Sequence, residues 1–279
     1  MSRDRFAARD QDYLRDVQYR DPTKLTARAD LHGRYGTAAQ GWFAWVVAQI
    51  DWPPAGDVLE VGCGPGWLWA EGGAGLPSGL RLTLTDLSPG MVAVAGDRVR
   101  SLSRFESVET QVADAQTLPF DDDAFDVVVA NHMLYHVPDP ARAVSELGRV
   151  LRPDGVLMAA TVGPRHLREL WEIRSEVFGV APTSHIVDVF GTETGRTILE
   201  EGFARVRWRE YEDTLHCTVA EDVVSFLTSA PPGEDASPGQ LDHLRRAVAS
   251  RFDTHGVLTV SKETGVFLAR DRSQPTTRP

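Results

Sequence analysis

A glycine-rich turn is the part of this sequence whose residue types and spacing best support chemistry. Residues 58–66 read Val-Leu-Glu-Val-Gly-Cys-Gly-Pro-Gly, so an apolar run that includes Glu60 passes directly into Gly62, Gly64 and Gly66. Glycine adopts positive φ at little cost and allows another molecule to approach the main chain closely. This combination predicts a strand, a tight turn and a cofactor bound against the turn.

The spacing of the glycines favours one cofactor class over another. Dinucleotide-binding dehydrogenases have the pattern G-x-G-x-x-G, which requires a glycine at position 67. This chain has Trp67 there, and its own pattern is E-x-G-x-G-x-G. Nicotinamide (NAD)-dependent hydride transfer is therefore a less favoured alternative.

Further polar residues stand where predicted strands end. Residues 82–86 alternate in polarity and end at Asp86, a short strand leads into Asp114, and the buried run 125–131 ends at Asn131. Because the carboxyl ends of parallel strands meet at one edge of a sheet, these groups are expected beside the glycine turn. A carboxylate in the position of Asp86 can accept both hydroxyls of a ribose.

In this order, the segments resemble the core of the class I S-adenosylmethionine-dependent methyltransferases, in the branch related to the ubiquinone and menaquinone methyltransferases. The resemblance covers residues 58–162 of the 279-residue chain. One such motif alone is a weak signal, but four in the right order are a strong one. The matching segments are 58–66, 86–91, 114–120 and 151–157.

The resemblance implies an α/β fold, with a seven-stranded, mostly parallel Rossmann-like sheet, helices on both faces and an antiparallel last strand. It also implies S-adenosylmethionine as cofactor, with its methionine part at 62–66, its ribose at Asp86, its adenine at Asp114 and Ala115, and its ammonium at the backbone of Asn131. The residues predicted to bind the cofactor are Tyr19, Glu60, Gly62, Gly64, Gly66, Asp86, Leu87, Met91, Asp114, Ala115 and Asn131.

Methyl transfer from a sulfonium depends mainly on positioning, because the methyl group already carries an excellent leaving group. A base is useful when the acceptor is a hydroxyl or phenol, and histidine is the obvious type. Residues 131–137 bring His132 and His136 to the expected edge of the sheet, so either is a candidate catalytic base. The alternative for His136 is packing against the following helix. An amine acceptor needs no base, so the acceptor atom (O, N or C) stays open.

The segments outside the core are expected to enclose a small organic substrate. Trp42, Trp45 and Val46 follow helical spacing and are predicted to pack on the sheet. By the same resemblance, the candidates for closing the pocket are Tyr19, Arg28 and Tyr35. The residues predicted to contact the substrate are Tyr35, His166 and Trp171. The predicted division is a helical N-terminal lid (1–50), a cofactor-binding core (51–162), a cap insertion (163–191), the C-terminal part of the sheet with a helical cap (192–270) and a disordered tail (271–279).

Composition excludes several other classes. A net charge of −11 disfavours a nucleic-acid partner, since phosphate binding needs a basic face. Two cysteines provide neither a disulfide framework nor metal-ligand spacing. The sequence shows no apolar run of about 20 residues and no signal-type start, so we expect a cytoplasmic protein without membrane contact. Use of the same fold by a non-methylating enzyme or a binding scaffold is an open alternative, and the oligomeric state is open as well.

Overall fold

The computed structural model describes residues 9–273. Most of the predicted disordered tail, residues 274–279, lies outside the described residues, as do residues 1–8 of the predicted lid. The last strand runs to Arg272, so the first two residues assigned to the tail belong to the sheet instead.

Seven strands form one sheet in the order β3-β2-β1-β4-β5-β9-β6. The strands β1 to β5 are parallel, and β9 is antiparallel to both of its neighbours. The predicted fold class is confirmed. The strands are β1 (Ala55–Val61), β2 (Gly79–Asp86), β3 (Ser107–Val112), β4 (Phe125–Asn131), β5 (Leu151–Val162), β6 (Phe203–Tyr211) and β9 (Thr264–Arg272).

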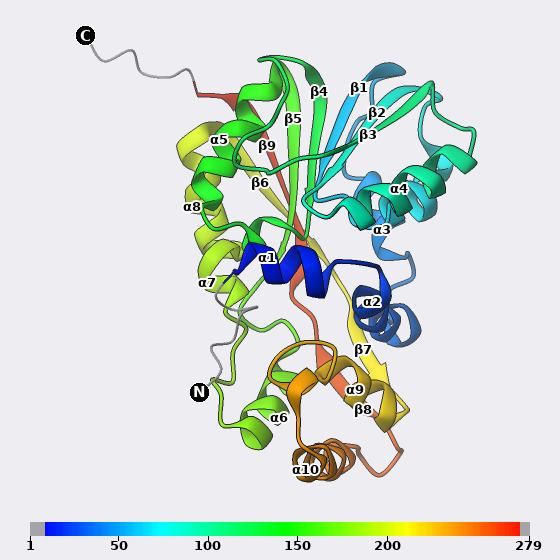
Figure 1. The fold of residues 1–279 in the computed structure, drawn as a ribbon, viewed down its shortest axis with the longest axis vertical. Coiled ribbons are helices and arrows are strands. Elements are labelled where there is room, and N and C mark those ends of the chain that lie inside the picture. The colour runs from blue at the N-terminus through cyan, green and yellow to red at the C-terminus, as the bar shows by residue number, and fades with distance from the viewer. Residues whose placement is uncertain (1–8, 274–279) are drawn as a thin grey trace.

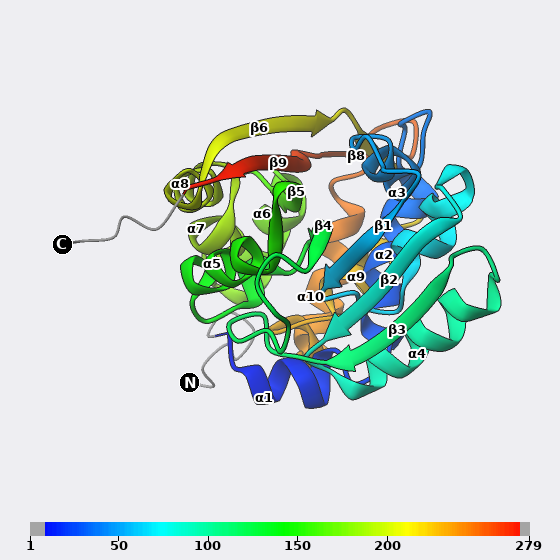
Figure 2. The same cartoon turned by 90° about the horizontal axis from the view of Figure 1, so that it is seen from above.

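Two layers of helices cover the sheet, one on each face (Figure 2). The helices α3 (Trp42–Val47) and α4 (Pro89–Ser101) lie on one face, and α5 (Pro140–Val150), α7 (Ile186–Phe190) and α8 (Thr192–Gly202) lie on the other. Because both faces are covered, the buried residues of the central strands are mostly apolar. Two separate clusters of buried side chains, one on each face, form the core of this half of the molecule.

A third apolar cluster lies beyond the carboxyl ends of the strands and forms a cap. It contains the two-stranded sheet β7 (Thr214–Cys217) and β8 (Leu258–Ser261) with helices α6 (Arg168–Phe178), α9 (Ala220–Leu227) and α10 (Pro238–Ala249). The small sheet and α10 were not anticipated from the sequence.

The N-terminal helices lie between the sheet and this cap (Figure 1). They are α1 (Gln11–Tyr13), which continues into a π-helical turn at Leu14–Gln18, and α2 (Thr23–Tyr35). Their position across the strand ends encloses the edge at which the polar residues were expected to meet.

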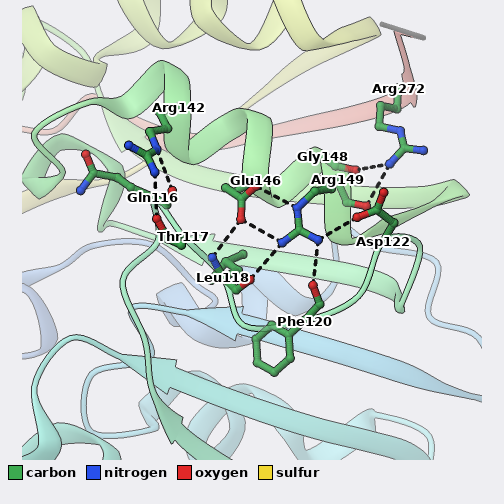
Figure 3. A network of polar contacts seen from close by, with 10 residues as sticks. All are labelled: Gln116, Thr117, Leu118, Phe120, Asp122, Arg142, Glu146, Gly148, Arg149 and Arg272. Atoms are coloured by element: carbon green, nitrogen blue, oxygen red, sulfur yellow. Dashed lines mark hydrogen bonds and ion pairs between the residues drawn. The ribbon is translucent and has the colours of Figure 1, made fainter.

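Two arginines of α5 hold the loop that follows β3, and Arg142 bonds to Gln116 and Thr117 (Figure 3). Arg149 of α5 donates hydrogen bonds to the carbonyl oxygens of Leu118 (3.0 Å) and Phe120 (2.7 Å). It also pairs with Glu146 and Asp122. These bonds to the main chain, together with the buried side chain of Leu118, fix the course of the loop beside the sheet edge.

We expect Arg149→Met to lower the free energy of unfolding by about 1 to 2 kcal/mol, because hydrogen bonds from a charged group to loop carbonyls are lost at a partly exposed site. Urea denaturation measures this change. Arg205→Met is the matched control, since Arg205 pairs with Asp271 on the surface and should matter much less. Equal effects of the two substitutions would contradict the anchoring role of Arg149.

Candidate active site

A cavity of about 1010 Å³ lies at the carboxyl edge of the sheet, between the sheet, the N-terminal helices and the cap. Its size exceeds that of most small-molecule pockets, which range from about 300 to 1,000 Å³. Turns after β1, β2 and β4 line one half of it, and residues of α2, α6, β6 and the turn after β8 line the other. The cavity therefore has room for a cofactor and a second molecule.

The turn after β1 has the left-handed backbone that its glycines allow. Gly62 and Gly64 have φ values of +68° and +52°. A Cβ at Gly62 would lie 2.6 Å from the Cβ of Met133, so no side chain fits there. At Gly64 the nearest atom is a methyl carbon of Leu25 at 3.7 Å, so its Cα faces the cavity. A ligand can approach the main chain at that position.

A carboxylate on the neighbouring strand braces this turn. Asp86 accepts a hydrogen bond from the backbone N–H of Gly64 (3.0 Å) and one from that of Ser88 (2.8 Å). Burial raises the pKa of Asp86, and these two donors oppose the increase. The remaining lone pairs of the carboxylate are available to hydroxyl groups of a ligand.

Glu60 is a second buried acid beside the turn. Its carboxylate accepts a hydrogen bond from the indole N–H of Trp69 at 2.6 Å. Burial raises the pKa of Glu60 to about 8, and the nearby Asp86 adds to the increase while Trp69 opposes it. Two buried acids at one turn favour a cationic ligand, because a positive charge stabilises their ionised forms.

Twelve of the predicted site residues line the cavity. They are Tyr19, Glu60, Gly62, Gly64, Asp86, Leu87, Met91, Asn131, His132, His136, His166 and Trp171. The side-chain oxygen of Asn131 is buried and has no hydrogen-bond partner among residues 9–273. Such an oxygen is expected to bond to a ligand, since buried polar atoms are rarely left unsatisfied.

Four predicted residues do not line the cavity. Gly66 packs against Val99 of α4 and serves the packing of the helix on the turn. Asp114 is exposed and accepts the N–H of Gln116 (2.9 Å), and Ala115 is buried in the core. Of this loop only the preceding Ala113 reaches the lining.

Tyr35 does not line the cavity, although it was predicted to contact the substrate. Its hydroxyl donates a hydrogen bond to Asp222 of α9 at 2.6 Å and lies outside the cavity. The helical phase of α2 turns Tyr35 toward the cap, whereas His32, one turn earlier, reaches the cavity. Tyr35 therefore joins the lid to the cap instead of contacting a substrate.

The two candidate histidines have different surroundings. Nε2 of His136 lies 2.8 Å from the hydroxyl of Tyr19, and its Nδ1 is buried. Burial, reinforced by Arg28, lowers the pKa of His136 to about 3. Both of its nitrogens are enclosed, so His136 is suited to docking the lid and not to contacting an acceptor.

His132 has a strained backbone and lines the cavity. Its φ is +56°, which is unusual for a residue with a side chain and is often found at functional sites. The hydroxyl of Thr264 donates its proton to the carbonyl oxygen of Thr161 (3.1 Å). At 3.5 Å from Nε2 of His132, that hydroxyl can then only accept, so Nε2 carries the proton and Nδ1 keeps a lone pair.

The sequence patterns missed several residues of the second half of the cavity. Trp42, predicted to pack on the sheet, also lines the cavity, with its ring 5.0 Å from that of His132 and 5.3 Å from that of Tyr211. Asp213 and Lys262 form a buried ion pair on the same wall. None of these residues belongs to a recognisable motif, so only the tertiary structure identifies them.

Among residues 9–273, no group of three or more histidine, cysteine, aspartate or glutamate side chains is arranged to hold a metal ion. None of the helices in the same range is both long and apolar enough to cross a membrane.

Comparison with known proteins identifies the core that carries this site. Residues 59–159 match the family described as "Methyltransferase domain". They include the glycine turn, Asp86 and the loop with both histidines. Residues 59–159 form a methyltransferase domain. Its relatives include the ubiquinone/menaquinone C-methyltransferase UbiE of Geotalea daltonii, 32% identical over 116 residues, which cover 42% of this chain and 49% of that one.

Other relatives of the methyltransferase domain are similarly distant. An uncharacterized 37.1 kDa protein in transposon TN4556 of Streptomyces fradiae is 33% identical over 174 residues, which cover 60% of this chain and 49% of that one. The chain spans about half the length of these curated relatives.

Solved structures share the fold of the methyltransferase domain over more of the chain. A putative methyltransferase from Bacillus halodurans has a TM-score of 0.58 at 18% identity, with 83% of this chain and 99% of that one covered. The [4+2]-cyclase SpnF has a TM-score of 0.57 at 19% identity, with 91% and 95% covered. At this level of identity the likeness establishes the fold only.

The environment of His132 predicts a pH-dependent stability. Burial, with a contribution from Lys262, lowers the pKa of His132 to about 4. The unfolded chain, with a histidine pKa of about 6.5, then binds more protons between these two values. The stability contributed by His132 is therefore fully present above about pH 6.5 and is lost as the pH falls toward 4, by about 2 kcal/mol between pH 7 and pH 5.

His132→Asn should remove this contribution. The free energy of unfolding of the variant, measured in urea, should fall by about 2 kcal/mol less than that of the wild type between pH 7 and pH 5. His216→Asn, at an exposed histidine of β7, is the matched control. Parallel pH profiles of wild type and His132→Asn would contradict the buried, neutral state of His132.

Proposed function

We propose that the protein transfers a methyl group from S-adenosylmethionine to an O, N or C atom of a small organic molecule enclosed in the cavity. This proposal rests on one observation: a single cavity has two halves with different linings. One half contains the turn from Gly62 to Gly64, which Asp86 braces, and this turn is of the type that binds a cofactor. The other half has room for a second molecule. The cofactor supplies an electrophilic methyl group on a sulfonium.

The residues present fit this cofactor. The open face of Gly64 provides space against the main chain, and Asp86 offers carboxylate lone pairs to ribose hydroxyls. The unpaired oxygen of Asn131 and the buried Glu60 are suited to a cationic amino acid group. Asp114 remains the residue proposed to bind the adenine, because it directly follows Ala113, which lines the cavity.

The N-terminal helices would act as the lid over this half. The Tyr19 hydroxyl binds His136, and the side chain of Gln11 donates to the carbonyl of His136 at 2.8 Å. A Cβ at Gly90 would lie 2.0 Å from the carbonyl oxygen of Arg20, so the lid backbone rests directly on the start of α4. Such a lid excludes water, which preserves the reactivity of a sulfonium.

His132 is the proposed base. When the acceptor is a hydroxyl or phenol, Nδ1 of His132 takes its proton as the new bond to the methyl carbon forms and the bond from carbon to sulfur breaks. The N–H at Nε2 stays hydrogen-bonded to the hydroxyl of Thr264, and this contact holds the ring in place. Above pH 5 the ring is neutral and its lone pair is available, because its pKa is about 4.

A non-methylating reaction on the same fold is the second candidate function. One structural neighbour, SpnF, is described as a [4+2]-cyclase, and the fold alone does not choose between the two chemistries. Production of S-adenosylhomocysteine distinguishes them. A cytoplasmic location and a small-molecule partner without nucleic acid remain predictions from the sequence.

Asp86→Ala should weaken binding of S-adenosylmethionine about 10- to 100-fold, because hydrogen bonds to a charged group and the brace on Gly64 are lost together. Isothermal calorimetry on the folded variant measures this change. Asp114→Ala is the matched comparison, and a loss of about threefold or more there would support the adenine assignment. Unchanged affinity in Asp86→Ala would exclude the ribose role.

Turnover distinguishes the two histidines. With methyl-labelled S-adenosylmethionine and a small-molecule extract of the source cells as acceptor, His132→Gln should lower label transfer at least about tenfold with unchanged cofactor affinity. His136→Gln should mainly weaken binding of the cofactor, because this variant loses the contact with Tyr19. Equal transfer of the label by the wild type and by His132→Gln would show that His132 is not the base. Absence of transfer by wild-type protein that binds the cofactor would favour the non-methylating alternative.

A further inference from the structure

Three consecutive residues between β8 and β9 hold the polar wall of the second half of the cavity. Lys262 pairs with Asp213, the backbone N–H of Glu263 donates to Nδ1 of His166 at 3.3 Å, and Thr264 contacts His132. This one turn therefore places a cation, a hydrogen-bonding histidine and the proposed base next to one another.

Lys262 has unused hydrogen-bonding capacity. Its side chain is 6% exposed and that of Asp213 is 2% exposed. An ammonium has three donor hydrogens, yet within residues 9–273 the only hydrogen-bond acceptor of Lys262 is Asp213, and the ring of Tyr211 lies 5.2 Å away. Because buried donors without acceptors are costly, this ammonium is suited to an acceptor on a ligand.

The charge of Asp213 is already offset by the backbone. Its carboxylate accepts the N–H groups of Thr37 (2.7 Å), Ala38 (2.9 Å) and Thr214 (2.9 Å) in addition to the Lys262 bond. The main chain thus fixes Asp213, and Asp213 in turn fixes the ammonium. Repulsion between Asp213 and a second anion at Lys262 is weakened by these three donors.

His166 supplies a second donor close by. Its Nδ1 accepts the N–H of Glu263, and burial lowers its pKa well below the ordinary value, so the ring is neutral and the proton is on Nε2. The ring of His32 stacks on it at 5.9 Å with an interplanar angle of 13° and fixes its orientation. His166 lines the cavity, and its Nε2 has no partner among residues 9–273.

Aromatic rings border this donor pair. Trp42 and Tyr211 both line the cavity, with ring centroids 5.3 Å apart, and Lys262 lies over the Tyr211 ring. Aromatic walls of this kind favour a planar, apolar body with a polar end.

We propose that the methyl acceptor is a planar aromatic carboxylate, with its carboxylate bound by Nζ of Lys262 and Nε2–H of His166 and its ring against Trp42 and Tyr211. This inference rests on the proposed function, because it assigns the second half of the cavity to the acceptor. The carboxylate anchors the molecule on the wall that also carries His132, so a hydroxyl on the same ring can reach the proposed base.

The test measures binding of matched acid and amide pairs to the full chain saturated with S-adenosylhomocysteine. The probes are 4-hydroxybenzoate against 4-hydroxybenzamide and 6-hydroxy-2-naphthoate against 6-hydroxy-2-naphthamide, followed by quenching of tryptophan fluorescence. At least one acid should bind about tenfold or more tightly than its amide. Lys262→Met should reduce this preference below about threefold while the affinity for S-adenosylhomocysteine is unchanged.

Two further variants keep the test decisive. Lys262→Met combined with Asp213→Asn removes both charges, in case the unpaired carboxylate prevents folding. Lys24→Met, at the only other lysine of the chain, should retain the preference for the acid. Equal binding of acid and amide, a preference that survives in both Lys262 variants, or no binding of any probe to the loaded protein would overturn the proposal. Failure to bind S-adenosylhomocysteine would instead refute the proposed function.

Discussion

The site depends on a hydrogen bond between two neighbouring strand ends. The carboxylate of Asp86, at the end of β2, accepts the N–H of Gly64 in the turn after β1 and so holds that turn in its left-handed conformation. Backbone at positive φ is available mainly to glycine, and it directs main-chain groups toward the cavity. The parallel register of β1 and β2 sets the separation of the two groups, so the sheet itself determines the geometry of the turn.

The sequence predicts the part of the fold in which local patterns and chain order agree. The limits of β4 at Phe125 and Asn131, the glycine turn and Asp86 all follow from short motifs. β5 begins at Leu151, which pairs with Phe125 of β4 ahead of a register shift. An irregular pairing of this kind leaves no periodic signal in the sequence.

The acceptor half of the cavity was largely unpredictable for a different reason. Lys262 and Asp213 are 49 residues apart, and each is an ordinary charged residue in its own segment. The antiparallel pairings of β7 with β8 and of β6 with β9 bring them together. Tyr35 lies outside the cavity because of the helical phase of α2. Residues three positions apart on a helix point in neighbouring but not identical directions, so His32 reaches the cavity and Tyr35 does not.

The neutrality of His132 constrains how the protein can lower a reaction barrier. Burial and the nearby Lys262 keep the lone pair of this histidine free, but they also make it a weak base. Proton removal by such a group assists only late in bond formation, so most of the rate enhancement must come from positioning. The same cation that weakens the base stabilises negative charge developing on an acceptor nearby, which reduces the basicity that the reaction requires. The left-handed backbone of His132 and its contact with Thr264 then serve orientation more than proton affinity.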